Sequence, residues 1–358
     1  MTRTVSRPGG HAPMIWLWLI LTVSALNGNA IAGNPHVTTN PSGINNYGVI
    51  VGTYSSVIHP EANSFVDTKY THFMNFADPM AMGMTDASGI NDQGAVVGTY
   101  YVGSHVHGFL YAGGSFETID YPSASDTRLA GINNAGDITG FEYQTGGVSS
   151  FEYVNGAFFI IADPEAISNG TEVAGINNTG SIAGSSNISG VEEGFVLSSG
   201  VFTHLVVPGS IYTSAGGIND LGSVVGNFIA TPQGPSQGYL YSGGKYTTID
   251  FPGAAQTFLG GINNSGAITG FAFGVQTGRK ITDAGFVYQN GVFTVISDLG
   301  HSNPIPEPAT WTLMILGLGG LGGLGAALRR SRRARRPAVL SVCGADRRER
   351  RRRDALHQ

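Results

Sequence analysis

A ten-residue pattern recurs six times along the chain, and it restricts the possible folds more than any other feature. The pattern is Gly-Ile-Asn-(Asn/Asp)-x-Gly-x-(Ile/Val)-x-Gly, with copies 42–46 residues apart. A second recurring piece, an aromatic-rich hairpin such as residues 108–120 or 238–250, lies between the copies. Self-similarity at this period is the signature of repeat architectures. The six copies begin at Gly43, Gly89, Gly131, Gly175, Gly217 and Gly261.

Each recurring piece predicts two short strands joined by a tight turn. In Asn-Asn-x-Gly, Asn and Asp suit the first positions of a type I turn, and Gly supplies the positive φ of a following bulge. Residues 133–136 therefore predict a turn that links strands 129–132 and 137–143. The pairs Asn155-Gly156 and Asn290-Gly291 are strong hairpin signals. One repeat thus holds four strands.

Four strands in 42–46 residues match a propeller blade. The hairpin at Gly43 has no aromatic hairpin before it, and the aromatic hairpin at Gly285 has no Gly-Ile-Asn copy after it. We therefore expect an all-β fold, a six-bladed β-propeller over residues 43–300, in which N- and C-terminal strands together complete the sixth blade. An open β-solenoid is the alternative, but it needs capping repeats, and none is apparent.

The N-terminus has the order of a secretory signal peptide. Residues 1–13 carry two Arg and no acid, an apolar run from Met14 to Leu26 follows, and Ala30-Ile-Ala32 is a small-x-small cleavage pattern. We expect residues 1–32 to be a signal peptide that directs the chain to the Sec translocon and is cut after Ala32, with residues 33–42 as a linker. An uncleaved N-terminal anchor is the alternative reading.

The C-terminal region carries three elements in a fixed order. Pro306-Glu307-Pro308 lies in a linker, residues 301–310, before an apolar run of 18 residues, 311–328, which is long enough to cross a bilayer. An Arg-rich tail, residues 329–358, follows, and the positive-inside rule places it in the cytoplasm. The cluster after the span includes Arg329, Arg330, Arg332 and Arg333.

These three elements together resemble the PEP-CTERM sorting signal of Gram-negative bacteria. The resemblance implies that an exosortase, a membrane protease, processes an inner-membrane-anchored precursor, which then reaches the cell surface or the exterior. Prolines hold the backbone extended and accessible to a protease, so Pro306, Glu307 and Pro308 would carry recognition. The repeats, over roughly residues 40–300, resemble HAF-type repeats of bacterial extracellular proteins, a family that implies no general activity.

No catalytic, cofactor or metal motif is evident between the ends. HExxH, G-x-S-x-G, P-loop and EF-hand patterns are missing, and the Asn-Asn-x-Gly loops fit turns better than calcium loops, which need several carboxylates. The only Cys is Cys343 in the tail, so the exported part has no disulfide. We expect no catalytic residue, cofactor or metal.

Two weaker patterns are candidates for a cation site. Acids recur at the end of the aromatic hairpin and could converge on one face of a ring, although Asp before Pro is also an ordinary strand terminator. His105 and His107 are two apart, so they share one side of a strand, but no third ligand is evident. The recurring acids are Asp78, Asp120, Asp163, Asp250 and Asp298.

Charge is distributed very unevenly and excludes one class of partner. Residues 34–308 hold 5 Lys and Arg against 21 Asp and Glu, a net charge of −16, whereas residues 329–358 hold 12 Arg and 3 acids, a net charge of +9. Nucleic-acid binding needs cations that neutralise phosphates, so we expect no nucleic-acid partner. Beside a membrane span, the Arg tail is a determinant of topology that contacts anionic lipid.

Three functions remain open. The first is a non-catalytic surface or matrix protein that binds extracellular polysaccharide or protein partners, with Tyr100-Tyr101 and Phe141–Tyr143 as candidates for stacking on sugars. The second is an extracellular lyase or hydrolase with acids converging at the centre of the ring, since propellers host many chemistries. The third is ice or mineral binding, which the lack of flat Thr-rich arrays disfavours.

Overall fold

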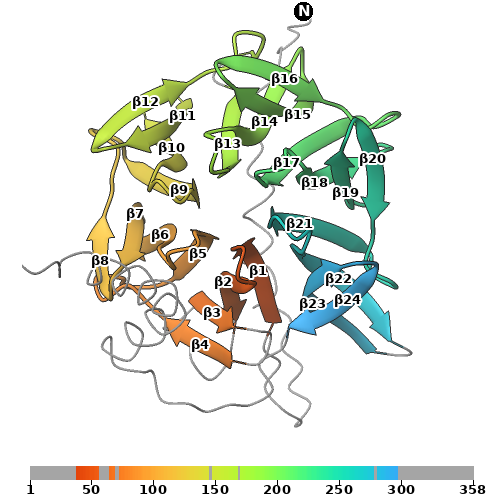
Figure 1. Ribbon diagram of the computed structural model, residues 1–358, viewed down its shortest axis with the longest axis horizontal. Coiled ribbons are helices and arrows are strands. Elements are labelled where there is room, and N and C mark those ends of the chain that lie inside the picture. The colour runs from red at the N-terminus through yellow and green to blue at the C-terminus, as the bar shows by residue number, and fades with distance from the viewer. Residues whose placement is uncertain are drawn as a thin grey trace, which may run out of the picture.

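The computed structural model is an all-β ring of six four-stranded antiparallel sheets (Figure 1). It describes residues 38–55, 64–68, 72–144, 147–167, 170–277 and 280–296. No helix occurs among these residues. The prediction of a six-bladed propeller is confirmed.

Each blade is one contiguous stretch of chain whose strands run in order from the centre of the ring outward. Blade 1 contains β1 (Thr38–Ile44), β2 (Val49–Ser55), β3 (Ser64–Thr68) and β4 (His72–Phe76). Blade 2 contains β5 (Thr85–Ile90), β6 (Val96–Val102), β7 (His105–Ala112) and β8 (Ser115–Thr118). Blade 3 contains β9 (Asp126–Ile132), β10 (Ile138–Gln144), β11 (Gly147–Val154) and β12 (Ala157–Ile161).

The remaining blades repeat this plan. Blade 4 contains β13 (Thr171–Ile176), β14 (Ile182–Ile188), β15 (Val191–Ser198) and β16 (Val201–Leu205). Blade 5 contains β17 (Tyr212–Ile218), β18 (Val224–Ile229), β19 (Gln237–Ser242) and β20 (Lys245–Ile249). Blade 6 contains β21 (Gln256–Ile262), β22 (Ile268–Thr277), β23 (Lys280–Gln289) and β24 (Val292–Ile296).

The predicted turns form as the sequence indicates. Asn133 N–H donates to the Asp137 carbonyl at 3.0 Å and Gly136 N–H to the Asn133 carbonyl at 3.2 Å, closing the turn between β9 and β10. Asn155 and Gly156 both have positive φ, 49° and 85°, which is the type I′ geometry that suits the twist of a hairpin. The aromatic hairpins are therefore closed by the chemistry that their sequence predicts.

The Gly of Gly-Ile-Asn is required where neighbouring inner strands approach most closely. A Cβ on Gly89 would lie 3.1 Å from the Cα of Gly131 in the next blade, which is too close for most side chains. In every blade the register between the first and second strands shifts at or near this Gly, as a β-bulge does. Gly therefore allows six strands to meet around one axis.

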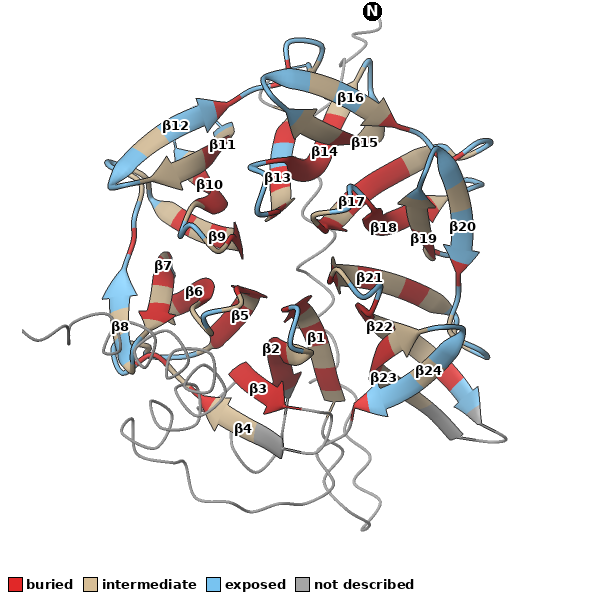
Figure 2. Cartoon of the chain, in the orientation of Figure 1, coloured by how far each residue is buried: buried red, intermediate tan, exposed pale blue. Residues whose placement is uncertain are grey.

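The core lies between the blades and is built from the aromatic hairpins. One aromatic residue from the third strand of each blade is fully buried, and most of them contact an aromatic of the fourth strand, as Phe151 does with Phe158 at 5.0 Å between ring centroids. Figure 2 shows exposed residues concentrated on the outermost strands and at turns. The six buried rings belong to Phe65, Phe109, Phe151, Phe195, Tyr239 and Phe286.

The prediction that both chain ends share the sixth blade is wrong. Blade 6 is formed by β21–β24 alone, and the hairpin at Gly43 pairs with its own aromatic strands, β3 and β4. The sequence between Ser64–Thr68 and His72–Phe76 is Lys-Tyr-Thr and lacks the Gly that ends this turn in the other five copies, so no hairpin signal marks this pair. The ring is closed instead by packing of β1 against β21, β22 and β23.

Hydrogen bonds support this closure between the first and last blades, which we call the closing interface. The Thr39 hydroxyl donates to the Ile296 carbonyl at 2.6 Å, and the Thr269 hydroxyl to the Ser42 carbonyl at 3.2 Å. No peptide link joins β24 to β1. Side-chain hydrogen bonds and packing therefore hold the first and last blades together, whereas other propellers close with a sheet shared by both ends of the chain.

Candidate functional site

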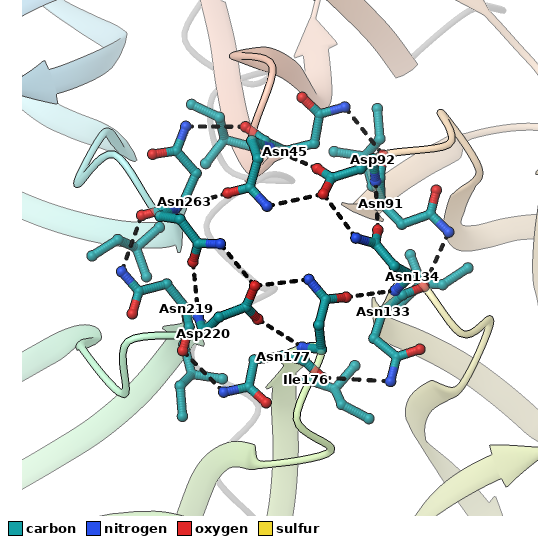
Figure 3. A pocket seen from close by; sticks show the side chains of 18 residues that line it. Asn45, Asn91, Asp92, Asn133, Asn134, Ile176, Asn177, Asn219, Asp220 and Asn263 are labelled. Atoms are coloured by element: carbon teal, nitrogen blue, oxygen red, sulfur yellow. Dashed lines mark hydrogen bonds between the residues drawn. The ribbon is translucent and has the colours of Figure 1, made fainter. Parts of the chain in front are cut away.

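The six Gly-Ile-Asn turns meet on the ring axis and form a cavity to which every blade contributes an Ile, an Asn and a second Asn or an Asp. The innermost strands of all six blades point the same way relative to the ring axis. The turns at their carboxyl ends therefore meet on one face of the ring (Figure 3). The cavity has a volume of about 60 Å³, enough for a few water molecules, each of which needs at least roughly 10–15 Å³. Two residues follow each of the six Gly-Ile pairs, and we call these twelve residues the central Asn ring: Asn45, Asn46, Asn91, Asp92, Asn133, Asn134, Asn177, Asn178, Asn219, Asp220, Asn263 and Asn264.

The first residue of each pair is a buried Asn with two tasks. In blade 5 the Oδ1 of Asn219 accepts hydrogen bonds from the backbone N–H groups of Leu221 (3.1 Å) and Ser223 (2.9 Å), which fixes its own turn. Its Nδ2 donates to the backbone carbonyl of Asn263 in the next blade at 3.0 Å. The same pair of tasks occurs in all six blades, with Nδ2-to-carbonyl distances of 2.9–3.4 Å.

The second residue of each pair forms an outer circle of hydrogen bonds. Its side-chain oxygen accepts from the backbone N–H of the equivalent residue in the preceding blade, at 2.8 or 2.9 Å in all six cases. Asn264 N–H donates to Asn46 Oδ1 at 2.8 Å across the closing interface. Both circles are therefore complete around the axis.

Asp92 and Asp220 occupy opposite blades of this circle, and Asn amides flank each of them. The Nδ2 groups of Asn178 (2.9 Å) and Asn264 (2.7 Å) donate to Asp220 Oδ2. Burial tends to raise the pKa of Asp220, but the hydrogen bonds from Asn264 and Asn178 together lower it below its usual value. These hydrogen bonds join the six blades at the central Asn ring.

The recurring Asp residues do not converge. Asp78, Asp120, Asp163 and Asp250 follow the outermost strands β4, β8, β12 and β20, and Asp298 lies outside the described residues. Asp78 and Asp163 accept from the backbone N–H two residues on, at 2.8 and 3.0 Å, and Asp120 and Asp250 accept from Gly108 and Gly238 N–H on the third strand of their own blade. Their alternative reading as strand terminators is therefore correct.

The two histidines do not form a metal site. His107 Nδ1 lies 2.7 Å from Asp120 Oδ2, and its ring stacks on Tyr100 at 5.1 Å between centroids. His105 lies two residues earlier at the exposed start of β7. Across the part of the chain that the structure describes, no group of three or more His, Cys, Asp or Glu is arranged to hold a metal ion.

The predicted sugar-stacking aromatics are only partly accessible. Tyr100 and Phe141 are buried between blades, so these two predictions are wrong. Tyr101 and Tyr143 are half-buried, and the Tyr101 hydroxyl accepts a hydrogen bond from Arg128 Nη1 at 3.1 Å. The burial follows from the strand alternation, which turns Tyr100 toward the neighbouring blade.

A second group of ionisable residues, which sequence reasoning missed, lies toward the other face of the ring. Three residues before each Gly-Ile-Asn, near the start of the inner strands, the six blades carry different side chains. Five residues of strand separate this position from the central Asn ring, or roughly 15 Å. We call this set the entry positions: Asn40, Asp86, Arg128, Glu172, Ser214 and Phe258.

Asp86 is the most strongly perturbed of the entry positions. Its side chain is buried, and neither carboxylate oxygen has a hydrogen-bond partner within the described ranges. Burial raises the pKa of Asp86 to about 7, although the charge of Arg128 opposes the rise. Asp86 therefore takes up a proton near neutral pH.

Glu172 and Glu192 lie on β13 and β15, the first and third strands of blade 4. Burial, and then the charge of Glu172, raise the pKa of Glu192 to about 7. Burial also raises the pKa of Glu172, although this side chain remains accessible to solvent. Burial raises the pKa of Tyr212 to about 12, and the charges of Glu192 and Glu172 contribute to the rise.

The entry positions can be recognised when the six repeats are aligned with one another. The residue just before each of them is Thr in all six copies, and each Thr is buried and bonds to the preceding blade, as Thr171 does with Asp163 N–H at 3.0 Å. Ring packing therefore fixes the residue type at the Thr position but not at the entry position beside it. The six residues are Thr39, Thr85, Thr127, Thr171, Thr213 and Thr257.

The terminal predictions lie outside the described residues. These are the signal peptide with Ala30 and Ala32, the span 311–328, and the sorting residues from Pro306 to Arg333. Within the described ranges, no helix is long and apolar enough to cross a membrane.

The PEP-CTERM protein-sorting motif matches residues 304–333. The match contains Pro306-Glu307-Pro308 and the first four arginines of the cluster, so the PEP-CTERM prediction is confirmed and the chain carries the signal of an exported protein. A search of curated proteins finds no significant match for the whole sequence.

Several solved structures are similar to the chain at low identity. TolB from Acinetobacter baumannii is 12% identical with a TM-score of 0.52, and the match covers 71% of this chain and 65% of TolB. Virginiamycin B lyase from Staphylococcus aureus, solved with quinupristin, is 12% identical with a TM-score of 0.41, covering 75% and 90%. A mutant of AofleA from Arthrobotrys oligospora is 12% identical with a TM-score of 0.47, covering 73% and 88%. The similarity to TolB shows the fold alone.

Proposed function

We propose that this chain is a non-catalytic protein of the cell surface or extracellular matrix, in which a PEP-CTERM signal delivers a HAF-like propeller to the envelope. The observation that carries the proposal is the sorting motif at residues 304–333, which directly follows a closed ring. Residues 1–32 would direct the chain to the Sec translocon and be cut after Ala32. The span 311–328 would then hold the precursor in the inner membrane.

An exosortase-type protease would process this precursor at Pro306-Glu307-Pro308, with the Arg cluster holding the tail in the cytoplasm. The processed propeller would remain at the surface or leave the cell. The net charge of −16 over residues 34–308 supports a soluble, self-repelling module outside the cell.

The partners we propose are envelope polysaccharides or proteins. Support comes from exposed aromatic side chains such as Tyr47 and Phe159, which offer flat apolar faces for sugar rings. The alternative, an extracellular lyase or hydrolase, has lost the acids that motivated it, because Asp78, Asp120 and Asp250 follow outer strands and bond to local backbone.

Cell fractionation with intact-mass measurement tests the sorting proposal. We expect the mature protein in the surface or medium fraction, without residues 1–32 and without the segment that follows Pro308. The variant Pro306→Ala with Pro308→Ala should remain in the inner membrane with its tail intact, whereas Pro304→Ala should be processed normally. Recovery of the unprocessed chain in the cytosol, or normal processing of the double variant, would refute the proposal.

A glycan array probed with the exported protein tests the polysaccharide partner separately. Tyr47→Ala with Phe159→Ala should bind less than the wild type if these faces stack on sugars. No binding to any envelope polysaccharide at millimolar concentration would eliminate the polysaccharide and leave the sorting result unaffected.

A further inference from the structure

His204 lies between two carboxylates at the interface of blades 3 and 4. Its Nε2 is 3.4 Å from Asp163 Oδ2, and its Nδ1 is 3.4 Å from Glu193 Oε2. Asp163 belongs to the link from β12 to β13, whereas His204 is on β16 and Glu193 on β15. The imidazole therefore connects the end of one blade with the outer strands of the next (Figure 1).

The pairing of β15 with β16 positions the imidazole beside the first of these acids. His204 pairs with Phe195 across the two strands. Glu193 lies two residues before Phe195, so it is on the same face of the sheet and diagonally opposite His204.

The backbone of the link holds Asp163 in place and leaves one of its oxygens to face His204. Asp163 N–H donates to Thr171 Oγ1, and Asp163 Oδ1 accepts from Glu165 N–H, both at 3.0 Å. The Asp163 side chain is 0% exposed. Its Oδ2 and both ring nitrogens of His204 are buried and have no hydrogen-bond partner in the described part of the chain. A buried carboxylate costs free energy unless a hydrogen bond or an opposite charge compensates for it, and His204 is placed to supply both.

No other blade combines these groups. In the link between blades 5 and 6 the residue equivalent to Asp163 is Phe251, whose ring packs on the buried ring of Phe286 at 5.2 Å between centroids. The link between blades 1 and 2 also has an acid here, Asp78, but the outer strand that follows has Thr where blade 4 has His204. The other outer strands have Asn, Ile, Thr or Val at that position. Ring packing therefore does not require an imidazole beside a buried carboxylate.

We propose that His204 forms a pH-sensitive contact that joins blade 3 to blade 4 when its imidazole takes up a proton. A protonated imidazole has an N–H on both nitrogens, so it donates to Asp163 and Glu193 at the same time. The neutral ring has one N–H, so one of the two carboxylates then faces a nitrogen lone pair. Only the folded chain brings both acids to His204, so the proton stabilises this interface at acidic pH, and its loss weakens the interface as the pH rises. This proposal goes beyond the surface function and does not depend on it.

The other ionisable groups on the neighbouring elements do not contact His204. Glu165 in the link is exposed. Burial raises the pKa of Glu192 to about 7, but Glu192 lies on the opposite face of β15 from Glu193. Burial raises the pKa of Tyr212, on β17, to about 12, so its hydroxyl stays uncharged at neutral pH. Within the described ranges, no Lys or Arg forms an ion pair with the two acids that flank His204.

Hydrogen exchange at two equivalent links tests the contact in the unmodified chain. Asp163 N–H donates to Thr171 Oγ1 between blades 3 and 4, and Phe251 N–H makes the same bond to Thr257 Oγ1 between blades 5 and 6, both at 3.0 Å. The charge of an ordinary His changes between about pH 5 and pH 8, so we compare the full-length chain in a non-ionic detergent at about pH 7.5 and pH 5.5. The protection factor of the Asp163 amide should rise roughly tenfold or more at the lower pH, because hydrogen bonds to charged groups are stronger than neutral ones. The protection factor of the Phe251 amide should change less than about twofold, because no ionisable side chain replaces its packing.

Two matched variants assign the response to one imidazole. His204→Gln keeps a polar side chain but removes the titration, so the Asp163 amide should lose its dependence on pH. His105→Gln removes an imidazole from the exposed start of β7, so the response should remain as in the wild type. Equal rises at Asp163 and Phe251 in the wild type would show a global effect and overturn the proposal, even if His204→Gln fails to fold. A response that persists in His204→Gln would assign the proton to another group and would also overturn it.

Discussion

Replacement of one Asn at the closing interface tests whether side-chain hydrogen bonds hold the ring together. Asn263→Ala removes a buried amide whose Nδ2 donates to the Asn45 carbonyl at 3.0 Å in blade 1. Its Oδ1 accepts from the backbone N–H groups of Ser265 (3.1 Å) and Ala267 (3.0 Å) and from the Ser265 hydroxyl (2.8 Å). At roughly 1 kcal/mol for each of these four bonds, the free energy of unfolding should fall by about 4 kcal/mol.

Asn219→Ala is the matched variant within the ring. Asn219 is as buried as Asn263, fixes its own turn with two equivalent bonds, and donates to the next blade at 3.0 Å. Blades 5 and 6 are also joined by a peptide link, whereas blades 6 and 1 are not. We therefore expect similar losses of stability in chemical denaturation but different local opening.

Hydrogen exchange distinguishes the two variants. In Asn263→Ala the amides of β1 and β21 should lose protection before the other inner strands, because these two strands separate first. In Asn219→Ala the protection of β1 should change only with global stability. A loss below 1 kcal/mol in both variants, or the same exchange pattern in both, would refute the view that the central Asn ring closes the propeller.

Three further predictions follow from single residues. Burial raises the pKa of Asp86 in the folded state to about 7, against about 3.9 unfolded. The folded state therefore binds the proton more tightly, and the free energy of unfolding should fall by at most about 4 kcal/mol as the pH rises from about 4 to about 7. Asp86→Asn should flatten the dependence of Tm on pH over this window, and an unchanged slope would contradict the cause. Tyr239→Phe should raise the free energy of unfolding by up to about 1 kcal/mol in urea denaturation, because it removes a buried hydroxyl without a partner; a clear loss would show that the hydroxyl is paired. Gly156→Ala should cost about 1 kcal/mol, because φ is +85° although no atom lies within 4 Å of the new Cβ, and a neutral effect in the same assay would show that the turn can relax.

The repeats allowed the ring to be predicted, but not its closure. The sequence showed six turn motifs and the aromatic hairpins, which define strands locally because Asn-Gly and Asn-Asn-x-Gly act through their own backbone. The first aromatic hairpin, with strands 64–68 and 72–76, departs from the pattern. The sequence therefore predicts blades that begin with an aromatic hairpin, whereas each blade of the structure begins with its Gly-Ile-Asn hairpin. Pairing of β2 with β3 decides the boundary, and this pairing is a contact that local patterns do not encode.

The candidate site depended even more on tertiary structure. The Asn residues were correctly interpreted as turn formers, but their second role, bonding from blade to blade, exists only when six turns meet on one axis. Asp78, Asp120 and Asp250 recur regularly but do not meet. They follow the outermost strands, where equivalent positions of different blades lie far apart around the rim of the ring.

By itself, the sequence determined the number of blades, the turn chemistry, the excess of acids in the exported part and the sorting motif at residues 304–333. These properties are local or additive, so they can be read along the chain. Only the tertiary structure decided where the ring closes and that two circles of amide hydrogen bonds surround its axis. The reason is geometric: rotation about a common axis turns residues that are equivalent in sequence into neighbours near the centre and separates them near the rim.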